Sequence, residues 1–107
     1  MHHFSYDADT RTLTGRLYGR LDTAACQELA AALAAELQTL QANPATNEGL
    51  HLTLDMAEVT FIASAFFRIC MSTVRKLPAE NFAIINSSDD IKRAFKLVEL
   101  DYFFKIS

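Results

Sequence analysis

The sequence predicts an α/β fold built on a mixed β-sheet, and three observations support this prediction. Leucines alternate with polar residues over 50–54, which is the period of a strand that buries one face. Apolar residues recur every three or four positions over 23–40 and over 64–77, as in helices packed on a sheet. An N-terminal pair of short strands adds a hairpin, and strands separated by helices after a hairpin form a mixed sheet.

Length and composition fit one globular domain. At 107 residues the chain can bury a core but is too short for two domains, and half of its residues are apolar, which argues against disorder. Ten basic and thirteen acidic residues give a net charge of -3, so charge gives no general reason to expect nucleic-acid binding. No apolar run reaches the roughly 20 residues of a membrane helix, and residues 1–7 lack a signal peptide's apolar segment. We therefore expect a cytoplasmic protein without membrane insertion.

The first two strands and the first helix have clear local signals. Strands are expected over 4–7 and 12–18, joined by the polar residues 8–11 in a loop of hairpin length. Asp22 or Thr23 can cap the helix that follows, because a side-chain oxygen there can accept from early N–H groups that lack an acceptor within the helix. The apolar stripe expected to face the sheet consists of Cys26, Leu29, Leu33, Leu37 and Leu40.

The middle of the chain is expected to run from a strand into a second helix. Asparagine, proline and glycine over 41–49 predict a loop. The strand that follows is expected to end at Asp55, with a brief extended piece over 59–62. Ser64 is then placed to cap the second helix, whose first N–H groups need acceptors. Residues 55–66 are called the strand-to-helix corner below.

Apolar residues cover two neighbouring stripes of the second helix, which Pro78 ends. One stripe holds Phe67, Cys70, Met71, Val74 and Leu77, and the other holds Phe66, Ile69 and Thr73. A helix needs only one such stripe to pack on a sheet. Two interpretations of the other stripe remain open: neighbouring helices bury it, or it leaves an apolar patch near the helix start for a partner.

The last third of the chain predicts a strand, a helix and a second strand. The continuous apolar run 82–85 is expected to be covered on both faces or to lie centrally in the sheet. Residues 87–90 supply capping hydroxyls and carboxylates for a helix over 91–97. The buried side of that helix is expected to hold Ile91, Phe95 and Val98. A strand rich in aromatic residues is expected over 102–106.

The sequence contains no recognisable catalytic motif. The sequence contains neither a Walker A loop nor a dinucleotide fingerprint. His51, Thr53 and Asp55 share one strand face, which is either a small polar site or a hydrogen-bonded strand surface. Cys26 and Cys70 fall within expected helices and have no CxxC neighbour, so we interpret them as buried free thiols. The sequence therefore predicts neither an enzyme nor a cofactor or metal site.

Three segments together carry a family pattern. Residues 55–67 read Asp-Met-Ala-Glu-Val-Thr-Phe-Ile-Ala-Ser-Ala-Phe-Phe, in the frame Asp-Leu-Ser-x-Val-x-Phe-Ile-Asp-Ser-Ser-Gly-Leu. Residues 19–22 read Gly-Arg-Leu-Asp, and 87–106 read as a final helix and strand. In these segments the chain resembles the STAS domains, which include bacterial anti-sigma-factor antagonists and cytoplasmic domains of sulfate transporters. The resemblance implies one STAS-like domain over 1–107, with a mixed sheet of four to five strands and three main helices mostly on one face.

The resemblance also implies a non-enzymatic regulatory domain that binds an anti-sigma factor or a serine kinase. In the family's antagonists a kinase phosphorylates the second serine of Asp-Ser-Ser-Gly at the helix start. That position is Ala65 here, which has no hydroxyl, and Ala63 and Phe66 replace the flanking aspartate and glycine. Ser64 is the remaining candidate for phosphorylation, and its alternative role is that of a helix N-cap.

The predicted partner-binding site lies around the start of the second helix and consists of Thr60, Ser64, Ala65, Phe66 and Ile69. Phe66, a large ring at a glycine-like position, is expected to make an apolar contact with the partner. Two alternatives stay open. One is an accessory domain of a transporter, which binds a small ligand or an ATPase subunit. The other is a self-associating module that forms a homodimer through Phe66 and Ile69.

Overall fold

One five-stranded sheet forms the framework of the structure, a computed structural model that describes residues 2–107. Met1, the first residue of the expected domain, lies outside the described residues. The strands lie side by side in sequence order. β1 pairs antiparallel with β2, and the other neighbours pair in parallel, so the predicted mixed sheet is confirmed. The strands are β1 (His2–Asp7), β2 (Thr12–Leu21), β3 (His51–Ile62), β4 (Phe82–Ile85) and β5 (Lys105–Ile106).

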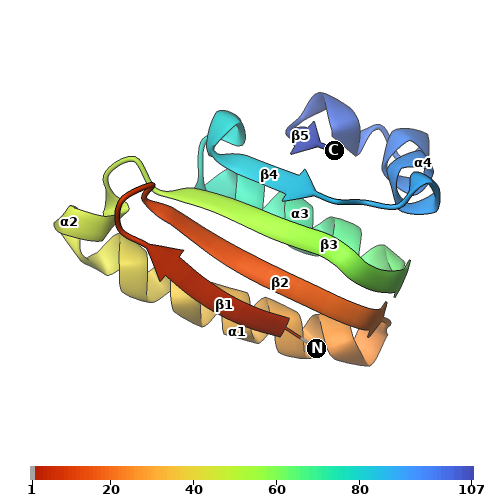
Figure 1. Cartoon of the computed structure of the whole chain (residues 1–107), viewed down its shortest axis with the longest axis horizontal. Helices are drawn as coiled ribbons and strands as arrows, with labels where there is room; N and C mark the ends of the chain where they lie inside the picture. The colour runs from red at the N-terminus through yellow and green to blue at the C-terminus, as the bar shows by residue number, and fades with distance from the viewer. Residues whose placement is uncertain (1) are drawn as a thin grey trace.

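The main helices cover one face of the sheet, as predicted. Figure 1 shows α1 behind β1 and β2 and α3 behind β3 and β4, with the opposite face turned to the viewer and open. The helices are α1 (Thr23–Ala42), α2 (Pro44–Asn47), α3 (Ser64–Lys76) and α4 (Asp89–Leu97), with 3₁₀ turns η1 (Ala79–Asn81) and η2 (Leu100–Tyr102).

The core lies between the sheet and the helices. Leu13 of β2 and Leu52 of β3 pair across the sheet, and both are fully buried. The α1 stripe is buried as predicted at Cys26, Leu29, Leu33 and Leu37, and Leu40 is half-buried. Gly15 makes room for the ring of Phe4, because a Cβ atom at Gly15 would lie 2.6 Å from Phe4 Cε1. Each buried leucine contributes about 1.5–3 kcal/mol, so this leucine layer supplies much of the hydrophobic stabilisation.

β3 does not end at Asp55, contrary to the prediction, and continues to Ile62. The pairing with β2 explains the difference. Arg16 pairs with Asp55. Tyr18, two residues further along β2, pairs with Glu58, three residues further along β3. β3 therefore carries one extra residue there, a bulge that interrupts the alternation of buried and exposed residues.

A second bulge follows three residues later. Gly19 pairs with Val59, but the next residue of β2, Arg20, pairs with Phe61. The bulges change which positions face the core, so Val59 is buried while Thr60 and Phe61 are both exposed. The end of β3 therefore turns two consecutive side chains toward solvent just before α3.

The segment 41–49 is more regular than predicted. It contains the one-turn helix α2, whose N-cap is Asn43. Asn43 Oδ1 accepts from the backbone N–H of Ala45 at 2.9 Å, and Pro44 occupies the first helical position. Proline suits that position because its missing N–H would have no acceptor within the helix.

β4 is internal to the sheet, as predicted for residues 82–85, and helices cover one of its faces. The rest of the C-terminal part differs from the prediction in two ways. Val98 is exposed, because α4 ends at Leu97 and Glu99 adopts a left-handed conformation with φ 61°. The expected strand over 102–106 is reduced to β5, and η2 replaces its beginning. Leu97, Val98, Tyr102 and Phe103 therefore expose large apolar side chains within one short stretch.

Candidate protein-interaction site

The carboxyl ends of the three adjacent parallel strands β2, β3 and β4 lie at one edge of the sheet, where α1, α3 and α4 begin. This edge is the usual place for binding sites in α/β folds, because loops and helix N-termini converge there. The strand-to-helix corner lies at the middle of this edge, between β3 and α3.

Two of the three helices that begin at this edge have a side-chain cap. Asp22 Oδ1 accepts from the N–H of Ala25 at 2.9 Å at the start of α1, which confirms the predicted cap. Ser88 Oγ accepts from the N–H of Ile91 at 3.3 Å at the start of α4. α3 differs, because its N-cap is Ala63 and no side chain accepts from its first turn.

The prediction that Ser64 caps α3 is therefore wrong. Ala63 is the last residue with extended backbone angles, φ -86° and ψ 164°, and Ser64 is already helical. A residue inside the helix cannot place its side chain over the N–H groups of the following turn as an N-cap does. Ser64 is instead exposed on the first turn of α3.

Three of the predicted site residues lie at the surface. Thr60 at the end of β3 and Ser64 on α3 are exposed, and Ala65 is half-buried. Arg68, which the sequence analysis did not include, is exposed one helical turn after Ser64. These four residues, together with Phe61 at the end of β3, form what is called the α3-start surface below.

The other two predicted site residues are buried, so the prediction that they touch a partner is wrong. Phe66 has 0% of its surface exposed and Ile69 has 7%. Phe66 packs against Phe95 of α4, with ring centroids 6.1 Å apart in an edge-to-face arrangement. Burial of the stripe with Phe66, Ile69 and Thr73 is thus confirmed, and it leaves no apolar patch at those positions for a homodimer.

Apolar exposure near the corner comes from a different aromatic residue. Phe61 is 39% exposed on the open face, and Arg20 lies over its ring, 4.3 Å from the centroid. Tyr18, two residues before Arg20, is exposed to a similar extent. Phe61 is not among the predicted site residues because the predicted strand ends at Asp55, although alternation from the buried Leu52 and Leu54 also places Phe61 on the outward side.

Grooves flank α3 on both sides of its exposed ridge. Ala65, Arg68 and Ser72 of α3 line a groove of about 240 Å³ against Gln27 and Ala30 of α1. On the other side, Phe67, Met71 and Arg75 of α3 line a groove of about 400 Å³ against Val98 and Leu100. Arg68 borders both grooves, so the ridge that begins at Ser64 stands between two shallow, largely apolar channels.

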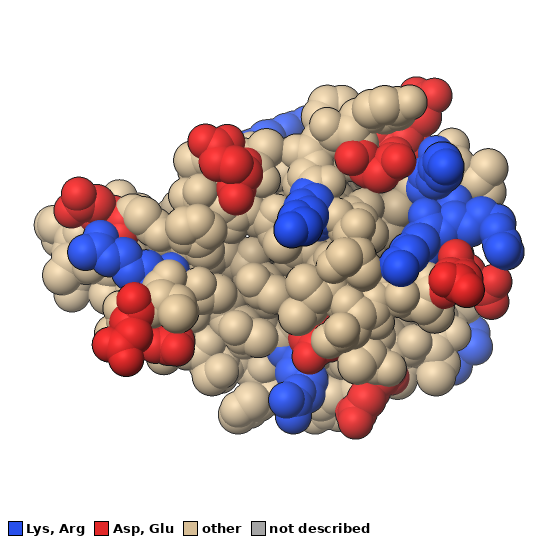
Figure 2. Space-filling view, turned by 45° about the horizontal axis from the view of Figure 1, so that its top comes forward, with Lys and Arg blue, Asp and Glu red and all other residues tan. Residues whose placement is uncertain are grey.

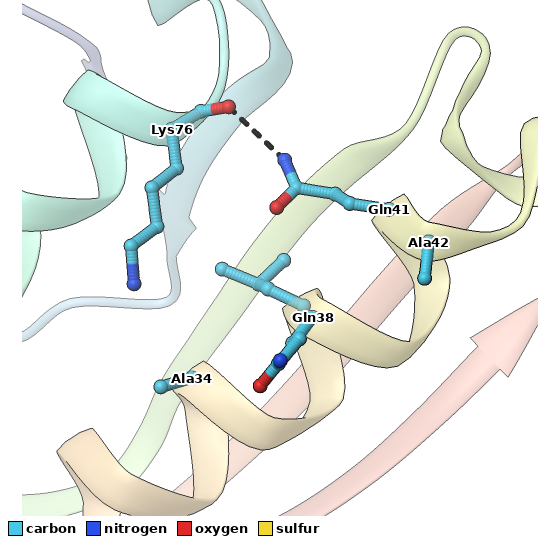
Figure 3. A pocket seen from close by; sticks show the side chains of 6 residues that line it. Ala34, Gln38, Gln41, Ala42 and Lys76 are labelled. Atoms are coloured by element: carbon cyan, nitrogen blue, oxygen red, sulfur yellow. Dashed lines mark hydrogen bonds between the residues drawn. The ribbon is translucent and has the colours of Figure 1, made fainter.

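A cavity larger than these two grooves lies away from the corner. It holds about 500 Å³ near the carboxyl ends of α1 and α3 and is lined by Ala34, Leu37, Gln38, Gln41, Ala42 and Lys76 (Figure 3). Gln41 Nε2 donates to the backbone oxygen of Lys76 at 3.1 Å and ties the two helices together. Its lining has one charged group and no nucleophile, so we interpret it as a packing gap between helix ends.

The helices next to the corner are basic although the whole chain is acidic. α3 carries Arg68, Arg75 and Lys76 and no acidic residue. α4 carries Lys92, Arg93 and Lys96, with two aspartates in its first turn. Figure 2 shows a group of basic side chains with acidic neighbours at the right of the molecule, the side on which Figure 1 places α4. Within residues 2–107 the one ion pair joins Arg93 to Asp90 at 3.1 Å.

The polar and thiol groups are engaged in structural contacts. Asp55 Oδ1 accepts from Asn86 Nδ2 at 3.1 Å and from the N–H of Ala57 at 3.0 Å, so this face is a hydrogen-bonded strand surface. Both cysteines are free and buried, as predicted, and burial raises the pKa of each thiol. No three metal-ligating side chains gather among the described residues. None of the helices within residues 2–107 has the length and apolar character needed to cross a membrane.

No protein-family model matches the chain, and no curated protein sequence matches it significantly. Solved structures do match. The anti-sigma factor antagonist SpoIIAA in its unphosphorylated form aligns with a TM-score of 0.70 and 15% identity over 100% of this chain and 87% of that one. The phosphorylated form of SpoIIAA, a Bacillus cell fate determinant, aligns with a TM-score of 0.69 and 15% identity over 100% of this chain and 91% of that one. An anti-sigma factor antagonist from Mycobacterium paratuberculosis aligns with a TM-score of 0.79 and 22% identity over 99% of this chain and 83% of that one. The chain therefore has the STAS fold that its sequence pattern predicts.

Proposed function

We propose that this chain, which has the fold of anti-sigma factor antagonists, is a non-enzymatic regulatory domain of a bacterial partner-switching system. Its partner is an anti-sigma factor or a serine kinase, and binding controls transcription in the cytoplasm. The observation that supports this most directly is the α3-start surface, where an uncapped helix start meets exposed side chains at the carboxyl edge of the sheet.

The chemistry of the α3-start surface suits a protein partner better than a small molecule. Its side chains project from a ridge flanked by shallow grooves, and Ala65 and Arg68 border the groove against α1. The free N–H groups of the first turn and the guanidinium of Arg68 both favour carboxylates or backbone carbonyls. Phe61 adds an aromatic contact of the kind that is enriched at protein interfaces.

Phosphorylation is the regulatory feature in which this chain departs from the pattern of the family. SpoIIAA has been solved in a phosphorylated and an unphosphorylated form. Ala65 here carries a methyl group at the position of the acceptor, so the partner binds without a phosphorylation cycle at that residue. Ser64 is exposed one residue earlier and is the acceptor that remains. A phosphate on Ser64 would lie at the positive end of the α3 dipole. Its roughly two negative charges would alter docking of the partner protein.

A kinase assay on the wild type and two variants tests the regulatory part of this proposal. Wild type, Ser64→Ala and Ala65→Ser are incubated with the serine kinase and ATP, and intact mass is measured. We expect Ala65→Ser to gain one phosphate. Any phosphate on the wild type should disappear in Ser64→Ala. If a purified kinase and anti-sigma factor from the source organism neither bind nor modify any of the three proteins, the proposed function is wrong.

A further inference from the structure

β1 is an edge strand whose outer side is unpaired among the described residues. It is the first strand in the sheet order, and its six residues pair only with β2. The pairing runs without interruption from His2–Leu17 to Asp7–Thr12. Figure 1 shows β1 along the lower edge of the sheet with no other strand beside it. Backbone N–H and C=O groups on the outer side of β1 have no partner strand among the described residues, so the edge is a template for another strand.

Three of the devices that block such an edge, proline, lysine and a bulge, are absent from β1. Its sequence, His-His-Phe-Ser-Tyr-Asp, contains no proline and no lysine. The regular register with β2 excludes a bulge, which would twist the edge away from a neighbour. A six-residue edge without these features suits addition of a strand better than protection from it.

We propose that β1 pairs antiparallel with β1 of a second copy of this chain, about a two-fold axis that passes through Ser5. In this register His3 of each copy lies opposite Asp7 of the other, and Phe4 lies opposite Tyr6. Two five-stranded sheets then join into one ten-stranded sheet with the helices of both copies on the same face. The symmetric arrangement makes one surface patch its own partner.

Charge on the open face favours this register. His3 lies opposite Arg16 on β2, so this row presents a base and a guanidinium toward the β1 edge. Asp7 lies in a different row, opposite the neutral Thr12. The proposed register places the Asp7 carboxylate of each copy opposite the His3 imidazole of the other, which can donate a hydrogen bond to it, with the Arg16 guanidinium one strand further along the same row.

Aromatic residues on the core face favour the same register. Phe4 and Tyr6 are half-buried at the border of the core and would gain contacts from a neighbour. Facing Phe4 with Tyr6 forms two such aromatic pairs. The two nearest alternatives that also match the faces of the strands place Phe4 opposite Phe4 or Tyr6 opposite Tyr6, and both move Asp7 away from His3.

Cysteine substitution at single positions tests the register. Opposed side chains of an antiparallel pair have Cβ atoms about 4.5–5.5 Å apart, whereas positions four residues out of register are more than about 10 Å apart. We expect Ser5→Cys alone to form a cross-linked dimer with a short bifunctional thiol reagent, and His3→Cys alone and Asp7→Cys alone to form no cross-link. A mixture of His3→Cys and Asp7→Cys should cross-link. The wild type is the blank, because its two cysteines are buried.

Sedimentation equilibrium at several concentrations gives an independent readout. Asp7→Asn removes the charge but keeps the oxygen that accepts from the N–H of Asp9 at 2.9 Å, so the turn after β1 is retained. We expect a dimer for the wild type, weakening by roughly threefold to tenfold in Asp7→Asn, and recovery in the swapped pair His3→Asp with Asp7→Lys, in line with the size of cross-strand charge pairs.

The outcomes separate this dimer from its rivals. A wild type that stays monomeric at all concentrations, or equal cross-linking of the three single-cysteine variants, overturns the proposal. Cross-linking of Ser5→Cys in a mixture with His3→Cys or with Asp7→Cys, without it in Ser5→Cys alone, assigns one of the two alternative registers and also overturns the proposal. The test does not involve the α3-start surface, so failure of either proposal leaves the other intact.

Discussion

Arg20 lies over the ring of Phe61, 4.3 Å from its centroid, at the end of the open sheet face. The contact exists because the two bulges together shift the register of β3 by two residues, so that Phe61 pairs with Arg20. The stacked guanidinium holds the ring in place without burying it. The pair therefore presents a preorganised aromatic surface next to Thr60 and the first turn of α3.

Replacing Phe61 should weaken partner binding with little effect on the fold. We expect Phe61→Ala to raise the Kd for the partner at least fivefold, which is about 1 kcal/mol for an exposed aromatic contact. The unfolding free energy should fall by only about 0.5–1 kcal/mol through loss of the cation–π contact. Isothermal titration and urea unfolding give the two values. Tyr102→Ala, an exposed aromatic outside the α3-start surface, is the matched control and should bind like the wild type.

Replacing Phe66 should mainly lower the stability of the fold. Its ring is fully buried against Phe95, so Phe66→Ala leaves a cavity and should lower the unfolding free energy by about 3–5 kcal/mol. Phe103→Ala removes the same atoms from an exposed position and should change stability by less than about 0.5 kcal/mol. Urea unfolding of both variants measures the difference. Equal stability of the two variants would show that Phe66 is not part of the core.

The contact between β1 and β2 depends on the missing side chain of Gly15. A Cβ atom there would lie 2.6 Å from Phe4 Cε1 and 3.0 Å from Leu54 Cδ2, which is too close on both sides. We expect Gly15→Ala to destabilise the fold by about 1–3 kcal/mol. Phe4→Leu in the Gly15→Ala background should restore part of that loss, because the shorter side chain frees the space. Additive effects in this double-mutant cycle would contradict the packing argument.

The buried thiol of Cys70 should make stability fall at high pH. Burial, with a smaller effect of Cys26, raises the pKa of Cys70 above its ordinary value of 9.0. Above about pH 9 the unfolded chain loses this proton and the folded chain keeps it, so the unfolding free energy falls by up to about 1.4 kcal/mol per pH unit from this group. Below pH 9 the contribution is fully present. Urea unfolding at several pH values should show a shallower alkaline decline for Cys70→Ala than for the wild type.

Elements with a strong local signal were predictable, and those that depend on distant contacts were not. The leucine stripe of α1 and the cap at Asp22 follow from residue spacing and side-chain chemistry within one turn. β3 carries two extra residues relative to β2. The sequence of one strand does not show how it pairs with its neighbour, so these bulges could not be predicted. The burial of Phe66 depends on Phe95, 29 residues later, which local periodicity does not report.

The candidate site shows the same division. The family-like pattern correctly located the junction between the strand and the helix. The surface residues there include Thr60, Ser64 and Ala65. Arg68 could have been found from its spacing of four residues from Ser64 on one helix. Alternation along the strand also places Phe61 on the outward side, but its contact with Arg20 depends on the register shift between β2 and β3, which one strand's sequence does not show.

The most direct test of the central claim, docking through the start of α3, is calorimetric titration of the partner protein with two alanine-to-glutamate variants. Both replace an alanine on a helix with a good helix former, Ala65→Glu on the α3-start surface and Ala35→Glu on the exposed side of α1. We predict at least a tenfold loss of affinity for Ala65→Glu and wild-type affinity for Ala35→Glu. Wild-type affinity for Ala65→Glu would contradict the account.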